Sequence, residues 1–171
     1  VLHHMDDPVA GWRILNGLLK PGGIMRIGLY SARAREEIAK VRDFISERGY
    51  DAIEDDIRTG RQAIIEHLRG STGEHLLSSV DFHSLHGARD LLFHAHEHRF
   101  TLPQIADIID DLGLEFLGFE LANWCTLAAF KNRFQNSDAL RSLDAWHQFE
   151  TENPHVFAGM YQFWLLKTAV T

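Results

Sequence analysis

Three histidines lie at alternate positions in one short segment of the chain, His94, His96 and His98. Side chains at alternate positions of an extended backbone point the same way, and on a helix His94 and His98 share a face. Because an imidazole ordinarily titrates near neutral pH, His94 and His98 are candidate catalytic proton acceptors. Asp90 and Glu97, in the same segment, are candidates for binding a polar substrate. The segment therefore predicts a polar reaction site.

The same histidines could ligate a metal ion, but their spacing argues against it. A zinc-binding helix usually carries H-E-x-x-H, whereas here Glu97 lies directly between His96 and His98. The chain has one cysteine, Cys125, and it is distant in sequence. We expect no metal ligands, and two interpretations stay open: a substrate pocket, or a polar junction between helices.

A second group of polar residues ends two expected strands. His3 and His4 end an apolar stub over 1–4, and Tyr30 and Ser31 follow an apolar run. Carboxyl ends of parallel strands border the crevice in which open α/β sheets bind ligands. These four residues are therefore expected to face one crevice. The alternative for His3 and His4 is a strand end that is packed against a helix cap.

The hydrophobic pattern predicts an α/β fold. Apolar residues recur at helical spacing in some segments and form short buried runs in others. Mixed charges among apolar residues at helical spacing favour a helical insertion over 32–92. The expected helices cover 8–19, 102–112 and 137–150, and the expected strands cover 24–30, 114–121 and 160–166.

Composition excludes several classes of protein. The 171 residues are 45% hydrophobic, which is enough for one domain with a substantial core. A formal charge of −7 offers little of the positive charge that binds nucleic acids. No apolar run reaches the roughly 18 residues of a membrane span, and the first residues lack a signal-peptide pattern. We expect a cytoplasmic protein without nucleic-acid or membrane partners.

Two stretches resemble the second half of a class I S-adenosylmethionine-dependent methyltransferase: Val1-Leu2-His3-His4-Met5-Asp6-Asp7-Pro8 and Leu19-Lys20-Pro21-Gly22-Gly23-Ile24-Met25-Arg26-Ile27-Gly28-Leu29-Tyr30-Ser31. Segments 100–121 and 157–167 are similar to the last helix and closing strands of that family. Residues 89–94 and 159–164 resemble bacterial methyltransferases that are often joined to tetratricopeptide repeats.

This resemblance implies a single partial domain over 1–171, with strands four to seven of a Rossmann-like sheet. The last strand would run antiparallel between strands five and six. The cofactor would be S-adenosylmethionine, and the acceptor an unidentified polar small molecule or protein. By the resemblance, Leu2, His3 and His4 approach the cofactor, and Tyr30, Ser31 and Arg33 approach the substrate.

The glycine-rich turn and the acidic residue that bind the cofactor in this family precede strand four, and neither occurs here. No G-x-G-x-x-G is present, and Gly22-Gly23 precedes a strand instead of joining a strand to a helix. We therefore expect the isolated chain to be inactive and to bind the cofactor weakly or not at all. An exposed sheet edge is expected to promote self-association. The alternatives are a noncatalytic interaction module and a histidine-based metal-binding module.

Overall fold

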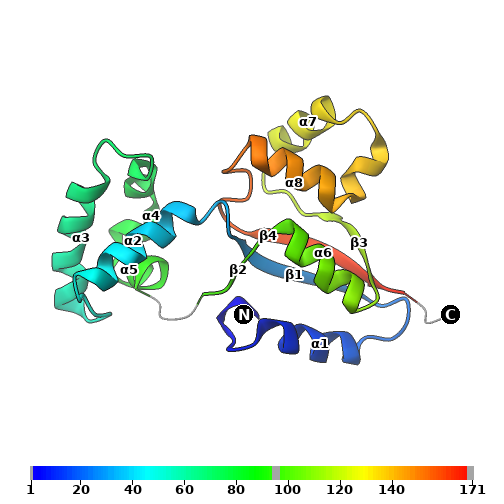
Figure 1. Cartoon of the computed structure of the whole chain (residues 1–171), viewed down its shortest axis with the longest axis horizontal. Coiled ribbons are helices and arrows are strands. Elements are labelled where there is room, and N and C mark those ends of the chain that lie inside the picture. Colours follow the sequence, from blue (N-terminus) through cyan, green and yellow to red (C-terminus); the bar gives the residue numbers. More distant parts are fainter. Residues whose placement is uncertain (1, 94–96, 169–171) are drawn as a thin grey trace. The chain divides into compact units, whose positions relative to one another are not determined.

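The computed structural model describes residues 2–93 and 97–168. The chain folds as two compact units, which we call the sheet unit (Val1–Ala34 with His98–Thr171) and the helical unit (Arg35–Glu97). The helices that were predicted over 32–92 all lie in the helical unit (Figure 1).

The sheet unit contains one four-stranded mixed sheet with the order β2-β1-β4-β3. β1 pairs with β4 antiparallel from Ile24↔Leu166 to Leu29↔Tyr161, and β3 also pairs with β4 antiparallel. The three predicted strands are therefore present, and the last one runs antiparallel between the other two, as expected. The strands are β1 (Ile24–Ser31), β2 (Arg99–Phe100), β3 (Leu114–Phe119) and β4 (Tyr161–Lys167).

The stub over 1–4 was predicted as a strand, and this prediction is wrong for its described residues. Leu2–His4 form a 3-10 turn, η1, and the Met5 N–H donates to the Leu2 carbonyl at 3.0 Å. The parallel neighbour of β1 is instead the short β2, where Tyr30 pairs with Arg99. The turn satisfies one carbonyl of the stub through the Met5 N–H, and the His3 carbonyl accepts from the His98 N–H, because unpaired buried N–H and C=O groups are costly.

The helices of the sheet unit begin at polar caps. The Asp7 carboxylate accepts from the Ala10 N–H at 2.9 Å, and Thr101 forms a capping box with Gln104. The helix that was expected over 137–150 is divided into η3 and α8, and α7 was not predicted. The elements are α1 (Pro8–Leu18), α6 (Leu102–Asp111), α7 (Trp124–Arg133), η3 (Ser137–Arg141) and α8 (Leu143–Glu152).

One hydrophobic core joins the sheet to α1, α6, α7 and α8. Alternate residues of β4 point into it, so Tyr161, Phe163 and Leu165 are fully buried while Trp164 is exposed. Trp146 of α8 stacks on Phe130 of α7 with ring centroids 3.8 Å apart. The aromatic residues near the end of the chain therefore pack the core.

The helical unit has its own smaller core. Ile38, Val41 and Ile45 of α2 pack with Ile64 and Leu68 of α3. No described helix is long and apolar enough to cross a membrane. The elements are α2 (Glu36–Glu47), α3 (Glu54–Leu68), η2 (Glu74–Ser78), α4 (Val80–His83) and α5 (Leu85–Leu92).

Candidate functional site

Two imidazoles and a phenol meet at the carboxyl end of β1. The His3 ring centroid lies 4.2 Å from that of Tyr30 and 4.3 Å from that of His4. His3 is buried, and its Nδ1 lies 3.3 Å from the Gly28 carbonyl oxygen. The turn of η1 thus brings predicted cofactor-side and substrate-side residues together in what we call the His3–Tyr30 cluster, formed by His3, His4 and Tyr30.

His98 joins this cluster through its backbone. Its N–H donates to the His3 carbonyl at 2.8 Å, directly before β2 pairs with the end of β1. The sequence places these residues 95 positions apart, but the sheet makes them neighbours. Of the predicted catalytic residues, the structure therefore places His98 beside the cluster, whereas His94 lies outside the described residues.

The end of β1 is fixed by a buried carboxylate that the sequence analysis missed. Ser31 Oγ and the Tyr161 hydroxyl both donate to Glu150 Oε1 at 2.6 Å. Ser31 was predicted to bind substrate, and here its hydroxyl is engaged inside the protein. Burial, followed by the negative charge of Glu150, raises the pKa of Tyr161 well above the ordinary phenol value. Tyr161 is therefore a neutral donor over the physiological range.

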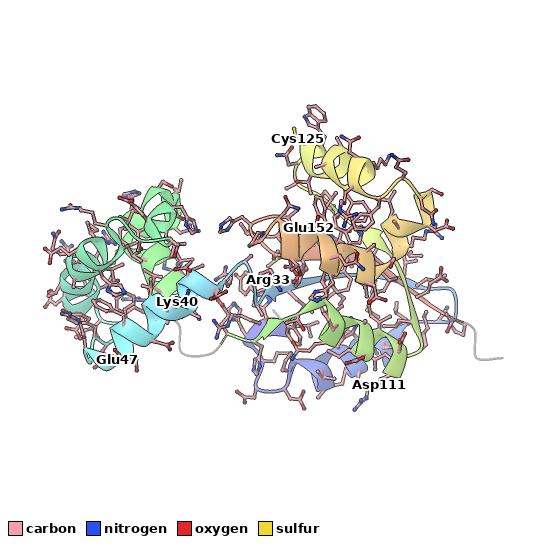
Figure 2. The ribbon with its side chains drawn as sticks, turned by 45° about the horizontal axis from the view of Figure 1, so that its top comes forward. Arg33, Lys40, Glu47, Asp111, Cys125 and Glu152 are labelled. Carbon is pink, nitrogen blue, oxygen red and sulfur yellow. The ribbon has the colours of Figure 1, made fainter. Side chains whose placement is uncertain are left out.

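Arg33 follows at the exit of β1, where it is partly exposed (Figure 2). Its charge lowers the pKa of Tyr161, although burial and Glu150 outweigh this effect. A guanidinium at this place provides several fixed donors for a polar or anionic group. In the sequence, Tyr30 directly precedes the anchored Ser31, and Arg33 follows it by two residues.

The remaining predicted substrate residues, Asp90 and Glu97, belong to the helical unit. Glu97 Oε2 lies 2.9 Å from Arg35 Nη1 and 2.9 Å from Arg42 Nη2, and its side chain is 2% exposed. Asp90 Oδ2 lies 3.5 Å from His86 Nε2. Both carboxylates therefore have partners within their own unit, and their role in substrate binding stays a prediction.

A metal site receives no support from the described part of the chain. Within residues 2–93 and 97–168, no three His, Cys, Asp or Glu side chains are placed to hold a metal ion. His94 and His96 lie outside these ranges, so the three-histidine alternative stays a prediction.

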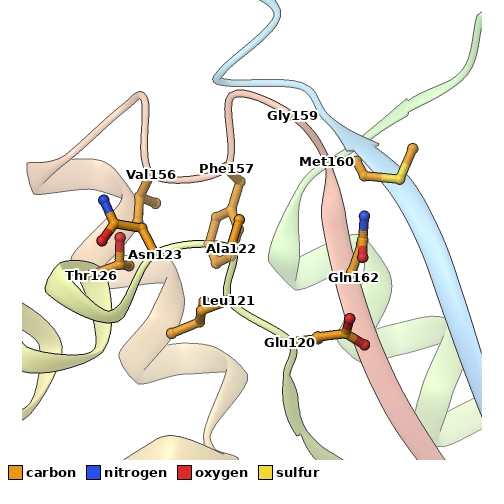
Figure 3. Close-up of a pocket in the computed structure, with 10 residues that line it drawn as sticks. All are labelled: Glu120, Leu121, Ala122, Asn123, Thr126, Val156, Phe157, Gly159, Met160 and Gln162. Carbon is orange, nitrogen blue, oxygen red and sulfur yellow. The ribbon is translucent and has the colours of Figure 1, made fainter.

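A pocket of about 260 Å³ lies between the end of β3 and the start of β4 (Figure 3). Glu120 and Gln162 line one side, and Asn123 and Thr126 line the other (Figure 3). Arg26 binds the Glu120 carboxylate at 2.8 Å and also donates to Gln162. The positive charge of Arg26 thus balances the pocket's carboxylate, which makes the pocket suited to a neutral polar group.

A second, mostly apolar cavity of about 480 Å³ lies between α1 and the outer side of β1. Met160 also lines the first pocket, so the two cavities share one wall. The described lining of this second cavity contains no carboxylate that could bind ribose hydroxyls. That this chain binds the cofactor weakly or not at all stays a prediction. The lining residues are Leu2, His3, Met5, Gly11, Ile14, Leu15, Arg26, Ile27, Gly28 and Met160.

Comparisons with known proteins relate this arrangement to methyltransferases. No protein-family model matches the chain. An uncharacterized protein of Synechococcus is 29% identical over 159 residues, which cover 87% of this chain and 37% of that protein. The structure of PKMT2 from Rickettsia typhi matches the whole chain with a TM-score of 0.64 and 17% identity. The structure of the same protein in complex with AdoHcy matches with a TM-score of 0.64 and 14% identity.

The two structural matches show a methyltransferase-like fold. The matches cover 34% and 35% of the two PKMT2 chains, so this chain spans about a third of the length of the proteins it resembles.

Proposed function

We propose that this chain is the acceptor-side part of an S-adenosylmethionine-dependent methyltransferase that methylates a polar acceptor. The observation that carries the proposal is the sheet, in which antiparallel β4 lies between β1 and β3 and the His3–Tyr30 cluster ends β1. The likeness to an AdoHcy-bound structure supports it. The resemblance to methyltransferases joined to tetratricopeptide repeats stays a prediction.

In this proposal the chain orients the acceptor and removes its proton. S-adenosylmethionine, when bound, supplies an electrophilic methyl group. Arg33 and Tyr30 bind polar groups of the acceptor beside the anchored end of β1. His98, and His94 by prediction, accept the proton of a poorly acidic nucleophile, a role that typically contributes about 10²–10⁴-fold to a rate.

A group of exposed apolar side chains on the sheet unit favours the binding of a further protein segment there. We call it the α1–β1 surface and define it as Met5, Ile14, Leu15, Leu18 and Ile24. All five side chains are exposed, beside a β1 whose outer edge is paired only at Tyr30 and Ser31 within the described residues. Exposed apolar groups beside an open strand edge favour association. We propose that strands carrying the cofactor-binding residues cover this surface in longer relatives, and that a second copy covers it in the isolated chain.

Methyl transfer from S-adenosylmethionine carrying a labelled methyl group tests the proposal, measured with a full-length relative that contains this region and has histidine at the positions of His86, His94 and His98. His94→Ala and His98→Ala are each expected to lower turnover about 10²-fold or more. The matched control is His86→Ala, because His86 lies on the exposed side of α5. Unchanged turnover in both variants with every acceptor that the parent methylates would contradict the proton-acceptor role. Absence of any methyl transfer would favour the noncatalytic module.

A further inference from the structure

Glu150 is a buried carboxylate that joins three elements of the sheet unit. It lies in the last turn of α8 and is 1% exposed. Its Oε1 accepts from Ser31 at the end of β1 and from Tyr161 at the start of β4, both at 2.6 Å. Hydroxyl donors to an ionised oxygen make short, strong hydrogen bonds. One carboxylate oxygen thus holds the ends of two neighbouring strands against one helix.

This burial is costly because no basic side chain among the described residues forms an ion pair with Glu150. The two hydroxyls supply the compensation. Tyr161 stays protonated, because burial and the charge of Glu150 raise its pKa. The buried carboxylate of Glu150 thus accepts both hydroxyl protons and fixes the direction in which Ser31 and Tyr161 donate.

Ser31 also forms a hydrogen bond within the turn that follows β1. While its hydroxyl proton points to Glu150, its oxygen accepts from the Ala34 N–H at 3.0 Å. In the same turn the Ala32 N–H donates to the Phe100 carbonyl at 2.8 Å. Arg33 lies between these two anchored residues. The conformation of the backbone around Arg33 therefore depends on a hydroxyl whose orientation Glu150 sets.

We propose that Glu150 is a positioning residue that fixes the turn over residues 31–34 through Ser31, and thereby places Arg33. The acceptor-binding role of Arg33 rests on the proposed function. The positioning of the turn does not, because it follows from hydrogen bonds within this chain.

Amide hydrogen exchange of Ala34 in the full chain, followed by NMR, tests the proposal. In Glu150→Met, a variant of similar size without acceptor oxygens, exchange of the Ala34 amide should be about tenfold faster or more, the equivalent of one lost hydrogen bond. Glu150→Gln retains an acceptor and should restore most of the protection. The Lys167 amide, which bonds to Gly23 at the other end of the sheet, should be unchanged in every variant.

Two further variants keep the test decisive. Ser31→Ala removes the acceptor of the Ala34 N–H directly, so its Ala34 exchange should be at least as fast as in Glu150→Met and clearly faster than in the parent. Glu152 lies in the same last turn of α8 (Figure 2) and forms an exposed ion pair with Arg133, so Glu152→Gln should leave the exchange of the Ala34 amide unchanged.

Equal Ala34 exchange in Glu150→Met, Glu150→Gln and the parent would overturn the proposal. So would faster exchange at Ala34 and Lys167 alike, because it would show general destabilisation. Neither result depends on methyl transfer, so failure of the proposed function would be seen separately, as loss of cofactor binding in a full-length relative.

Discussion

Removing the charge of Glu97 should destabilise the helical unit strongly. Its carboxylate forms ion pairs with Arg35 and Arg42, whose side chains are only 9% and 17% exposed. Breaking a buried ion pair by removing one partner costs about 3–5 kcal/mol, because the opposite charge stays buried. The Arg42 side chain is partly exposed and also donates to the Leu91 carbonyl. We therefore expect Glu97→Gln to cost about 3 kcal/mol, near the lower end of that range.

Arg42→Met is the matched comparison, because it leaves Glu97 paired with Arg35. It should cost less, about 1–2 kcal/mol, corresponding to the lost hydrogen bonds of one side chain. Native-state hydrogen exchange measures both values at the Ile57 amide, which bonds to the Ile53 carbonyl in the helical unit. A cost below about 1 kcal/mol for Glu97→Gln would refute this reasoning. It would mean that the carboxylate is hydrated, and would favour its predicted role in binding substrate.

Two further predictions concern ionisation and association. Because burial and Glu150 raise the pKa of Tyr161, its neutral form stabilises the folded chain below the ordinary phenol pKa of 10.0, and the free energy of unfolding should fall as the pH rises above that value. Denaturation of the parent and of Tyr161→Phe between pH 8 and 11 checks this, and an identical decline in both would refute it. Sedimentation velocity of the isolated chain should show concentration-dependent self-association that Leu18→Lys weakens, because this exposed side chain belongs to the α1–β1 surface. A monomeric parent at high concentration would contradict that surface assignment.

Local patterns in the sequence predicted the elements that carry strong periodicity. The cap and apolar spacing of α6, the alternation of β3 and the apolar run of β4 are local signals, so the positions and types of these elements could be predicted. The strand expected over 1–4 was wrong because so short a segment depends on a partner strand. The two-residue β2 was missed because its only signal is long-range pairing with β1.

The candidate site was predicted only in part, for the same reason. Tyr30 and His3 were expected to face one crevice as the ends of two strands, and they do lie together, although His3 belongs to a 3-10 turn instead of a strand. The Ser31–Glu150 bond spans 119 positions, which no local pattern reveals. The sequence did contain a signal that Glu150 is buried. Glu150 follows Trp146 by four residues in the expected helix, so the two side chains share one face of that helix. An acid on a buried helical face requires a polar partner, although the sequence does not show which one.

Calorimetry with S-adenosylmethionine should distinguish this chain from the full-length Synechococcus relative. We expect the full-length relative to bind one cofactor per chain. The isolated chain should show no micromolar binding, because no carboxylate among the described residues lining the cavity between α1 and β1 could bind the ribose hydroxyls. Micromolar affinity in the isolated chain, or no binding to the full-length relative, would contradict the proposal that this chain is the acceptor-side part of a methyltransferase.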